Sequence, residues 1–402
     1  MPAYQYLIVG GGMTADAAVE GIRQVDSTGT IGLIGAESNA PYDRPPLSKG
    51  LWKRTPLKSI WRKTAVREAV LHLGRRVVAL DLPHACVSDD QGTLYRYEKL
   101  LLATGGTPRR LPSASDSILY FRTVDDYHCL RRLAQEKQRF AVIGGGFIGS
   151  EIAAALAMNG KQVVLVFPQQ GIGSRIFPFD LSRFLNDFYR QKGVEVRAGE
   201  KVEMVDARGS QFVVQTRAVQ SGHEREIVVD AVVAGLGIQP NIELAQAAGL
   251  KVGGGIHVDT ALRTSHPDVF AAGDVAECFC PALEKYLRVE HEDNANTMGE
   301  AAGRSMAGQP VSYDHLSSFY SDLFELGYEA VGDVDSQLET VAEWKEPYRE
   351  GVVYYLQDGR VRGALLWNVW ERVEAARELI REAGPFQAED LEGRLGELHQ
   401  PI

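Results

Sequence analysis

Residues 6–22 read YLIVGGGMTADAAVEGI, an apolar run followed by three glycines and then by an alanine-rich run. The apolar run predicts a buried strand and the alanine-rich run predicts a helix, with Gly10–Gly12 as the turn between them. A further apolar run follows at residues 30–34, as a strand–helix–strand unit requires. This stretch therefore predicts an α/β fold built on a parallel sheet.

The same pattern recurs 134 residues later in the chain. An apolar run at 140–143 leads into Gly144–Gly146, then into an alanine-rich run at 148–158 and a second apolar run at 162–167. The sequence thus contains an internal duplication and predicts two Rossmann-like nucleotide-binding units.

The first glycine turn has the spacing of a phosphate cradle, Gly10-x-Gly12-x-x-Ala15. The first glycine permits a tight turn, the second admits a pyrophosphate close to the backbone, and the third position needs a small residue for helix–strand packing. The pyrophosphate would lie at the helix N-terminus, where free N–H groups favour negative charge. Glu37 follows Gly12 by 25 residues, which suits an acid that binds a ribose diol.

The second cradle, Gly144-x-Gly146-x-x-Gly149, has all three glycines but no acid after its second strand. Gln169 takes that place, and its amide can hydrogen-bond a diol without repelling a 2′-phosphate. Arg175 either reaches such a phosphate or is a solvated loop cation. These residues leave open whether the second cradle binds NADH or NADPH.

Two further strand ends predict backbone close to a cofactor. Residues 100–106 read LLLATGG, in which Ala103, Thr104 and Gly105 form a small-residue turn. Residues 269–274 read VFAAGD and end in Asp274, whose carboxylate can accept a hydrogen bond from a polyol chain.

The region after residue 318 predicts an α+β domain. Its expected strands are 329–334, 352–356 and 361–366, with a turn at Asp358-Gly359, and its expected helix is 371–383. We expect four segments, at 1–121, 122–241, 242–318 and 319–402. The first and third would form the domain of the first cradle, the second the domain of the second cradle, and the last a C-terminal interface or dimerisation domain.

Composition excludes several functional classes. The net charge of −10 argues against a nucleic-acid partner, since a polyanion would be repelled. No apolar run is long enough for a membrane span, and we expect no signal peptide. The four cysteines lack CxxC or CxxxxC spacing, which predicts a reducing cytoplasm and no metal site. A redox role for Cys278 and Cys280 stays open.

Several motifs resemble those of the FAD- and NAD(P)-dependent pyridine nucleotide oxidoreductases. They are PYDRPPLSK at 41–49, ATGGTPR at 103–109, IGGGFIGSE at 143–151, RVEHED at 288–293 and YEAVGDVD at 328–335. Within that superfamily the chain most resembles apoptosis-inducing factor-like flavoproteins and oxygenase-coupled ferredoxin reductases. The resemblance implies FAD in the first cradle and NADH or NADPH in the second.

The resemblance also implies roles for single residues. Lys49, held by Glu151, would stabilise negative charge on the reduced flavin, Phe147 would stand between the two rings, and His291 would contact them. Further FAD contacts would come from Arg44, Val78, Arg122, Glu290 and Tyr320, and a further NAD(P) contact from Gly237. Tyr320 stands where the family has a tryptophan. Each residue also has an ordinary structural alternative. These are a helix-packing aromatic for Phe147, a helix N-terminal acid for Glu151, a structural histidine for His291 and a surface ion pair for Arg122.

These observations predict a FAD-dependent NAD(P)H oxidoreductase that passes hydride to flavin N5 and electrons to a ferredoxin, quinone or similar acceptor. Residues 49–67 carry seven cations and no acid. Such a run forms either a docking surface for an acidic ferredoxin or an ordinary solvated surface. The alternative is a redox-sensing protein, like apoptosis-inducing factor, whose reduction forms a long-lived charge-transfer complex and changes dimerisation. That resemblance implies a homodimer.

Overall fold

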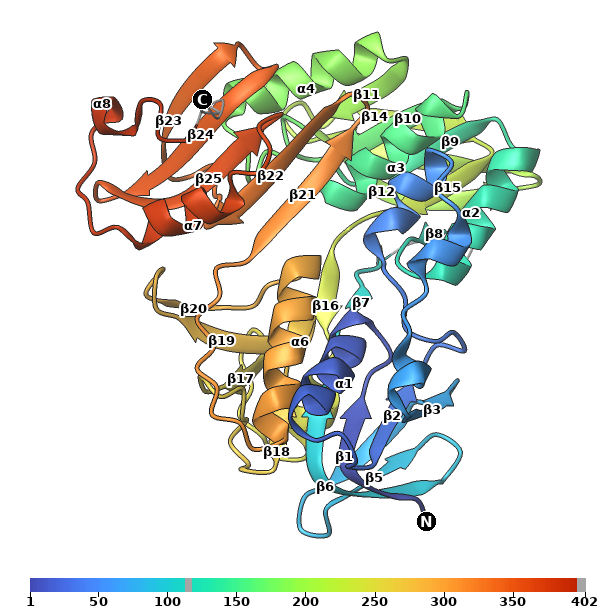
Figure 1. The fold of residues 1–402 in the computed structure, drawn as a ribbon. Helices are drawn as coiled ribbons and strands as arrows, with labels where there is room; N and C mark the ends of the chain where they lie inside the picture. The colour runs from blue at the N-terminus through green and yellow to red at the C-terminus, as the bar shows by residue number, and fades with distance from the viewer. Residues whose placement is uncertain (113–117, 396–402) are drawn as a thin grey trace. The chain divides into compact units, whose positions relative to one another are not determined.

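The computed structural model describes residues 1–112 and 118–395, so parts of the expected segments 1–121 and 319–402 lie outside the described residues. The chain forms two compact units, which Figure 1 shows as ribbons. Unit 1 comprises residues 1–44, 56–107 and 239–317, and unit 2 comprises residues 45–55, 108–238 and 318–402. The finer division into four segments remains a prediction.

Unit 1 is built on one sheet with the strand order β3-β2-β1-β6-β5-β4, in which β18 also pairs with β6. Its strands are β1 (Ala3–Val9), β2 (Ile31–Gly35), β3 (Ala69–Leu73), β4 (Val77–Asp81), β5 (Cys86–Asp89), β6 (Leu94–Leu102) and β18 (Val269–Ala271). The pairings of β1 with β2 and β6, and of β18 with β6, are parallel. Every residue of β2 and β18 is buried, as continuous apolar runs predict.

Two helices of this unit, α1 (Met13–Val25) and α6 (Glu292–Met306), lie side by side (Figure 1). Glycines bring their backbones together: a Cβ atom on Gly21 would lie 2.0 Å from the carbonyl oxygen of Glu300, and one on Gly303 would lie 2.1 Å from that of Ala18. The spacing Gly299-x-x-x-Gly303 therefore allows close helix packing.

Smaller elements complete unit 1. They are η3 (Leu57–Ile60), η4 (Thr64–Arg67), α5 (Glu243–Ala247), η5 (Gly273–Val275), and the sheet of β17 (Ile256–Val258), β19 (Ala276–Cys280) and β20 (Lys285–Leu287). The chain passes between the units within β7 (Gly106–Pro108) and β16 (Ile238–Pro240).

Unit 2 contains a second parallel sheet, of order β11-β10-β9-β15-β8. Its strands are β8 (Leu119–Tyr120), β9 (Arg139–Ile143), β10 (Gln162–Phe167), β11 (Val194–Ala198) and β15 (Ala231–Ala234), and its helices are α2 (Val124–Glu136), α3 (Phe147–Met158) and α4 (Phe179–Gln191). An antiparallel sheet of β12 (Glu200–Arg208), β13 (Gln211–Ala218) and β14 (Glu224–Val229) shares its core. The segment 45–55 adds η1 (Pro45–Leu47) and η2 (Gly50–Trp52).

The C-terminal part of unit 2 is an antiparallel sheet of order β21-β22-β25-β24-β23. It comprises β21 (Ser318–Leu323), β22 (Leu326–Gly332), β23 (Glu339–Glu346), β24 (Glu350–Gln357) and β25 (Arg360–Trp367), with α7 (Val373–Arg381) and α8 (Ala388–Leu391). Asp358 and Gly359 join β24 to β25 with φ of 52° and 71°, as the predicted turn requires. The predicted fold class is thus confirmed.

Several predicted boundaries in this region were wrong: β22 begins three residues earlier than predicted, α7 ends at Arg381 and not at 383, and strands β24 and β25 extend one or two residues further at each end. Strand β22 ends at Gly332 and not at residue 334, because Gly332 has a φ of 74° that interrupts the extended backbone. Helix α7 begins at Val373 and not at residue 371, because Glu371 has a φ of 62° that a right-handed helix excludes.

Candidate active site

The first glycine turn of unit 1 has the geometry of a phosphate cradle. Gly10 has a φ of 139°, and a Cβ atom there would lie 2.1 Å from the carbonyl oxygen of Ala103. The Ala103 N–H donates to the Val9 carbonyl at 2.8 Å, so the predicted small-residue turn passes beside the cradle. Only glycine permits this approach at position 10.

The space in front of this turn fits a dinucleotide pyrophosphate. Gly12 precedes α1, and a Cβ atom on Gly12 would meet nothing within 4 Å, which leaves room where the helix N–H groups point. Gly273 and Asp274 follow β18 and lie at the carboxyl edge of the same sheet. Gly273 has a φ of 76°, and a Cβ there would lie 2.3 Å from Thr14 Oγ1.

Glu37, the predicted ribose acid, belongs to a cluster with Arg44 and Tyr42. Arg44 Nη2 lies 2.5 Å from Glu37 Oε1, and the Tyr42 hydroxyl donates to Glu37 Oε2 at 2.6 Å. Burial alone would lower the pKa of Arg44, but Tyr42, Glu37 and Asp274 raise it above its ordinary value. Each carboxylate oxygen keeps a second lone pair, so Glu37 can still accept from a diol.

The second cradle, in unit 2, repeats this geometry. Gly144 has a φ of 116°, and a Cβ there would lie 2.3 Å from the Gly235 carbonyl oxygen. A Cβ on Gly149 would lie 1.8 Å from the carbonyl oxygen of Gly144, so this turn excludes a side chain at position 149. Gly146 precedes α3 and faces open space, which again leaves room for a pyrophosphate.

The residues predicted to distinguish NADH from NADPH lie after β10. Gln169 is half-buried, and its backbone carbonyl accepts a hydrogen bond from the Gly199 N–H at 2.7 Å, which holds the loop. The side-chain amide of Gln169 keeps its own hydrogen-bonding capacity. Arg175 is exposed. Gly237 has a φ of 79° and open space at its Cβ position.

Lys49, Phe147 and Glu151 all belong to unit 2. Lys49 Nζ lies 2.9 Å from Glu151 Oε1, and the Glu151 side chain is only 1% exposed. The segment around Lys49 is anchored because the Trp52 indole N–H donates to the Leu47 carbonyl at 2.8 Å. A buried carboxylate beside an ammonium group can hold that cation in one place.

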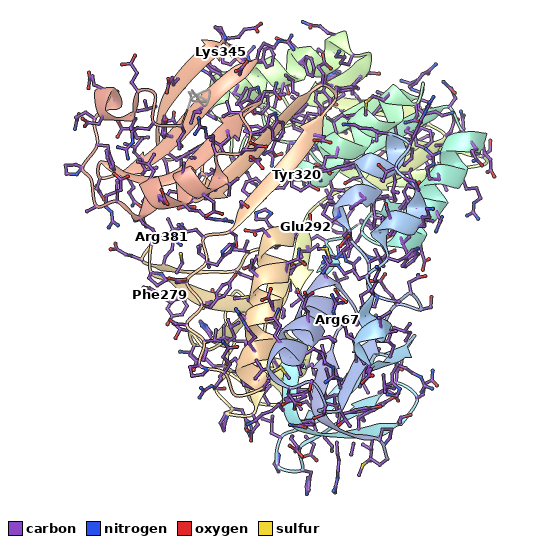
Figure 2. All side chains as sticks on the ribbon, viewed as in Figure 1. Arg67, Phe279, Glu292, Tyr320, Lys345 and Arg381 are labelled. Atoms are coloured by element: carbon purple, nitrogen blue, oxygen red, sulfur yellow. The ribbon has the colours of Figure 1, made fainter. Side chains whose placement is uncertain are left out.

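Three consecutive residues of β21 each contact one member of this trio. The ring centroid of Phe319 lies 5.2 Å from that of Phe147, and Lys49 Nζ lies 5.0 Å from the centroid of Tyr320. Ser321 Oγ donates to Glu151 Oε1 at 2.5 Å. Figure 2 labels Tyr320, which projects from β21.

The remaining predicted site residues divide between the units. In unit 1, His291 is half-buried at the N-cap of α6, and Glu290 pairs with Arg288 at 2.6 Å. Val78 lies on β4 and is 57% exposed. In unit 2, the Arg122 N–H donates to Asp126 Oδ2 at 3.0 Å, beside the capping box of α2. Their roles toward the cofactors remain predictions.

Sequence reasoning missed two residues that contact Glu151. Ser48 Oγ donates to Glu151 Oε2 at 2.5 Å, and Ser321 donates to the other oxygen. Ser48 lies within the motif at 41–49, but no periodicity marks its hydroxyl for a carboxylate 103 residues away. Ser321 is separated from Glu151 by 170 residues, so only the folded chain brings them together.

Residues 1–112 and 118–395 contain no cluster of His, Cys, Asp and Glu side chains that could hold a metal ion. Within the same ranges, no helix combines the length and apolar character that a bilayer span needs. The four cysteines are free thiols.

Two glycine cradles at the N-termini of α1 and α3 define a protein that binds two dinucleotides. A family model described as pyridine nucleotide-disulphide oxidoreductase matches residues 4–299, and the chain belongs to that family. A second model, described as the C-terminal part of mitochondrion-associated apoptosis-inducing factor, matches residues 302–347 and 342–382.

Individual relatives are similar over nearly the whole chain. The chain is 33% identical to apoptosis-inducing factor 1, mitochondrial, of Dictyostelium discoideum, over 94% of this chain and 78% of the relative. It is 34% identical to the ferredoxin–NAD(+) reductase component of the anthranilate 1,2-dioxygenase system of Burkholderia cepacia, over 94% and 95%. The solved covalent putidaredoxin reductase–putidaredoxin complex is 29% identical with a TM-score of 0.88, over 98% of this chain and 96% of that chain.

These similarities confirm the predicted class of enzyme and its cofactors. The protein is an NAD(P)H-dependent flavoprotein reductase that uses FAD.

Proposed function

We propose that this reductase passes electrons from NAD(P)H, through FAD, to a small acidic iron–sulfur carrier of the ferredoxin type. The observation that carries the proposal is a pair of exposed cations in unit 1, Lys58 and Lys63. Four of the seven cations at 49–67 pair with acids: Lys49 with Glu151, Lys53 with Asp322, Arg62 with Asp16 and Asp43, and Arg67 with Asp16 and Glu20. Arg54, Lys58 and Lys63 are exposed and have no acid partner among the described residues.

Unpaired exposed cations suit a surface that steers an acidic partner. A cation already bound to an acid presents little net field, whereas an unpaired one attracts a negatively charged partner and speeds its encounter. In unit 1 these cations have apolar neighbours in the chain, since Trp61 is 37% exposed and Val66 is 78% exposed. Exposed apolar side chains, aromatic ones above all, contribute to protein-docking surfaces. Reductases of ferredoxin-type carriers among the relatives support the same acceptor.

The side chains of the candidate active site would act by position and charge. FAD, when bound, accepts a hydride from the nicotinamide and can release the two electrons singly. Lys49 would place a positive charge beside the flavin, where negative charge develops on reduction, and Glu151 would hold that charge in place. Phe147 would cover the reacting ring and exclude water, since its own ring is already packed against Phe319.

Binding would follow from the two cradles. Gly12 and the start of α1 would hold the FAD pyrophosphate, with Glu37 at a ribose and Asp274 at the polyol chain. Gly146 and the start of α3 would hold the nicotinamide dinucleotide, with Gln169 at its ribose. His291 would hydrogen-bond the flavin ring from the N-cap of α6.

Charge reversal tests the proposed acceptor. Lys58→Glu with Lys63→Glu should lower kcat/KM for a ferredoxin by about tenfold at low salt, and the loss should shrink as salt screens the surface. The matched control is Lys251→Glu, which changes another exposed lysine of unit 1. Flavin reduction by NAD(P)H should be unchanged in all variants. A double variant that matches the control with ferredoxin at every salt concentration would exclude this docking surface.

A redox-sensing role is the second candidate, and the C-terminal model match at 302–382 favours it. Such a protein would stay reduced for minutes in air and would change its oligomeric state on reduction. Anaerobic reduction followed by gel filtration separates the candidates. Fast reoxidation by ferredoxin with no change in elution supports the reductase, and slow reoxidation with a shift to dimer supports the sensor.

A further inference from the structure

Glu151 accepts hydrogen bonds from three side chains that come from different parts of unit 2. Ser48 and Lys49 lie in the segment 45–55, whereas Ser321 lies on β21. Ser48 Oγ binds Oε2 at 2.5 Å, while Lys49 Nζ and Ser321 Oγ share Oε1 at 2.9 and 2.5 Å. Each oxygen of this buried carboxylate is therefore held by its own donors, which prevents rotation of the carboxylate about the Cγ–Cδ bond.

The Ser321 side chain is fully buried. Its exposed fraction is 0%, and Tyr328 lies directly opposite it in the pairing of β21 with β22. A serine has one hydroxyl hydrogen, and Ser321 gives it to Glu151 Oε1.

The ring of Tyr328 is fixed by aromatic packing. It stacks on Trp367 with centroids 5.6 Å apart and planes 8° apart, and it meets Phe177 edge to face at 5.2 Å. Burial, followed by the nearby Glu151 charge, raises the pKa of Tyr328 well above its ordinary value. Ser321 thus donates from a strand whose neighbour β22 is fixed by aromatic packing.

We propose that Ser321 is a positioning residue for hydride transfer: its hydroxyl holds Glu151 Oε1 so that Lys49 stays at one point beside the flavin. This inference rests on the proposed role of Lys49. It also gives the C-terminal sheet a part in the chemistry, because β21 supplies the hydroxyl that completes the carboxylate's set of donors.

The loss of Ser321 should loosen the ammonium group without removing any charge. With only Ser48 on Oε2, the carboxylate can rotate, and Lys49 follows Oε1 or moves toward the neighbouring ring of Tyr320. A catalytic charge that samples several positions stabilises the reduced flavin less than one held in place. Binding of the nicotinamide cofactor at the second cradle should not change, because Ser321 contacts none of the cradle glycines.

The test compares Ser321→Ala with Ser305→Ala. Ser305 is a buried serine of α6 in unit 1, and its hydroxyl donates to the Ala261 carbonyl at 2.7 Å. Stopped-flow reduction should be about tenfold slower in Ser321→Ala at saturating NADH, with its apparent Kd changed less than about twofold. The flavin midpoint potential should fall by about 30 mV, the equivalent of a tenfold change for a two-electron couple. Ser305→Ala should match the wild type in all three measurements.

A protein that already carries Glu151→Gln shows whether Ser321 acts through Glu151. When Glu151→Gln is already present, adding Ser321→Ala should slow reduction by less than about twofold, because the charge that Ser321 positions is gone. An equal slowing in both backgrounds would assign Ser321 to packing and overturn the inference. Wild-type rate and potential in Ser321→Ala would overturn it as well.

Two more variants keep the outcomes distinct. Lys49→Ala tests the proposed function itself, because an unchanged rate of flavin reduction in this variant would remove Lys49 from the mechanism. A slow rate in Lys49→Ala together with a wild-type rate in Ser321→Ala would refute only the positioning role of Ser321. Should Ser321→Ala fail to retain FAD, Ser321→Cys takes its place, because a thiol fills the same space and donates only weakly to Glu151. We expect about threefold slower reduction in Ser321→Cys, and a wild-type rate there would overturn the inference.

Discussion

The contact between α1 and α6 makes Gly303→Ala the sharpest test of the FAD-type unit. A Cβ atom at position 303 would lie 2.1 Å from the carbonyl oxygen of Ala18 and 2.9 Å from the backbone nitrogen of Ile22. Both neighbours are main-chain atoms of a helix, so no side-chain rotation can relieve the clash. The two helices would have to separate.

The size of the effect follows from these distances. An ordinary contact begins near 3.4 Å, so α1 and α6 would have to move apart by about 1.3 Å, the difference between 3.4 and 2.1 Å. A gap of that size removes much of the dispersion energy between the packed faces, and overpacking costs about 1–3 kcal/mol. Alanine recovers about 1 kcal/mol of helix propensity over glycine. We expect a net loss of about 2 kcal/mol.

Thermal unfolding with flavin fluorescence measures this loss. The melting temperature of Gly303→Ala should fall by about 5 °C, and FAD should be released more readily, because α6 carries His291 at its N-cap. Glu300→Ala serves as the control, since it changes a partly exposed side chain of the same helix and should stay within about 0.5 kcal/mol of the wild type. Equal or greater stability of Gly303→Ala would refute the close backbone packing.

Four further predictions address cofactor binding, pH dependence and thiol reactivity. Glu37→Ala should weaken FAD binding by about tenfold in an apoprotein titration, and full retention of flavin would remove Glu37 from the site. Gln169→Glu should raise the ratio of kcat/KM for NADH over NADPH, and an unchanged ratio would mean that position 169 does not contact the ribose. Backbone N–H donors and the Tyr6 hydroxyl lower the pKa of Asp26 to about 2, so its contribution to stability is present above about pH 4 and is lost as pH falls toward 2. Asp26→Asn should therefore lower the melting temperature more at about pH 7 than at about pH 3, and an equal shift at both would contradict this reasoning. Burial raises the pKa of Cys278 to about 11, so this thiol should resist thiol reagents at about pH 8 until the protein unfolds, and labelling of the native protein at Cys278, located by mass spectrometry, would count against its burial.

Features encoded by neighbouring residues could be predicted from the sequence. The turns at Gly10 and Gly144, the strands beside them and the turn at Asp358-Gly359 depend on backbone conformation and on apolar runs, which are local properties. The strand predicted at 162–167 agrees with β10 residue for residue. The pairing of Lys49 with Glu151 was also anticipated, but only through resemblance to a family.

The chain by itself therefore determined the α/β class, the two cradles and the identity of the groups that carry charge. Only the tertiary structure decided which groups meet: Ser321 reaches Glu151 from 170 residues away, and Gly303 packs on Ala18. No strand was predicted at 318–323, where β21 lies, and a strand prediction would not show which buried carboxylate its side chains meet. A turn depends on the dihedral angles of adjacent residues, whereas a hydrogen bond between distant side chains depends on how whole sheets and helices pack, which no short stretch of sequence encodes.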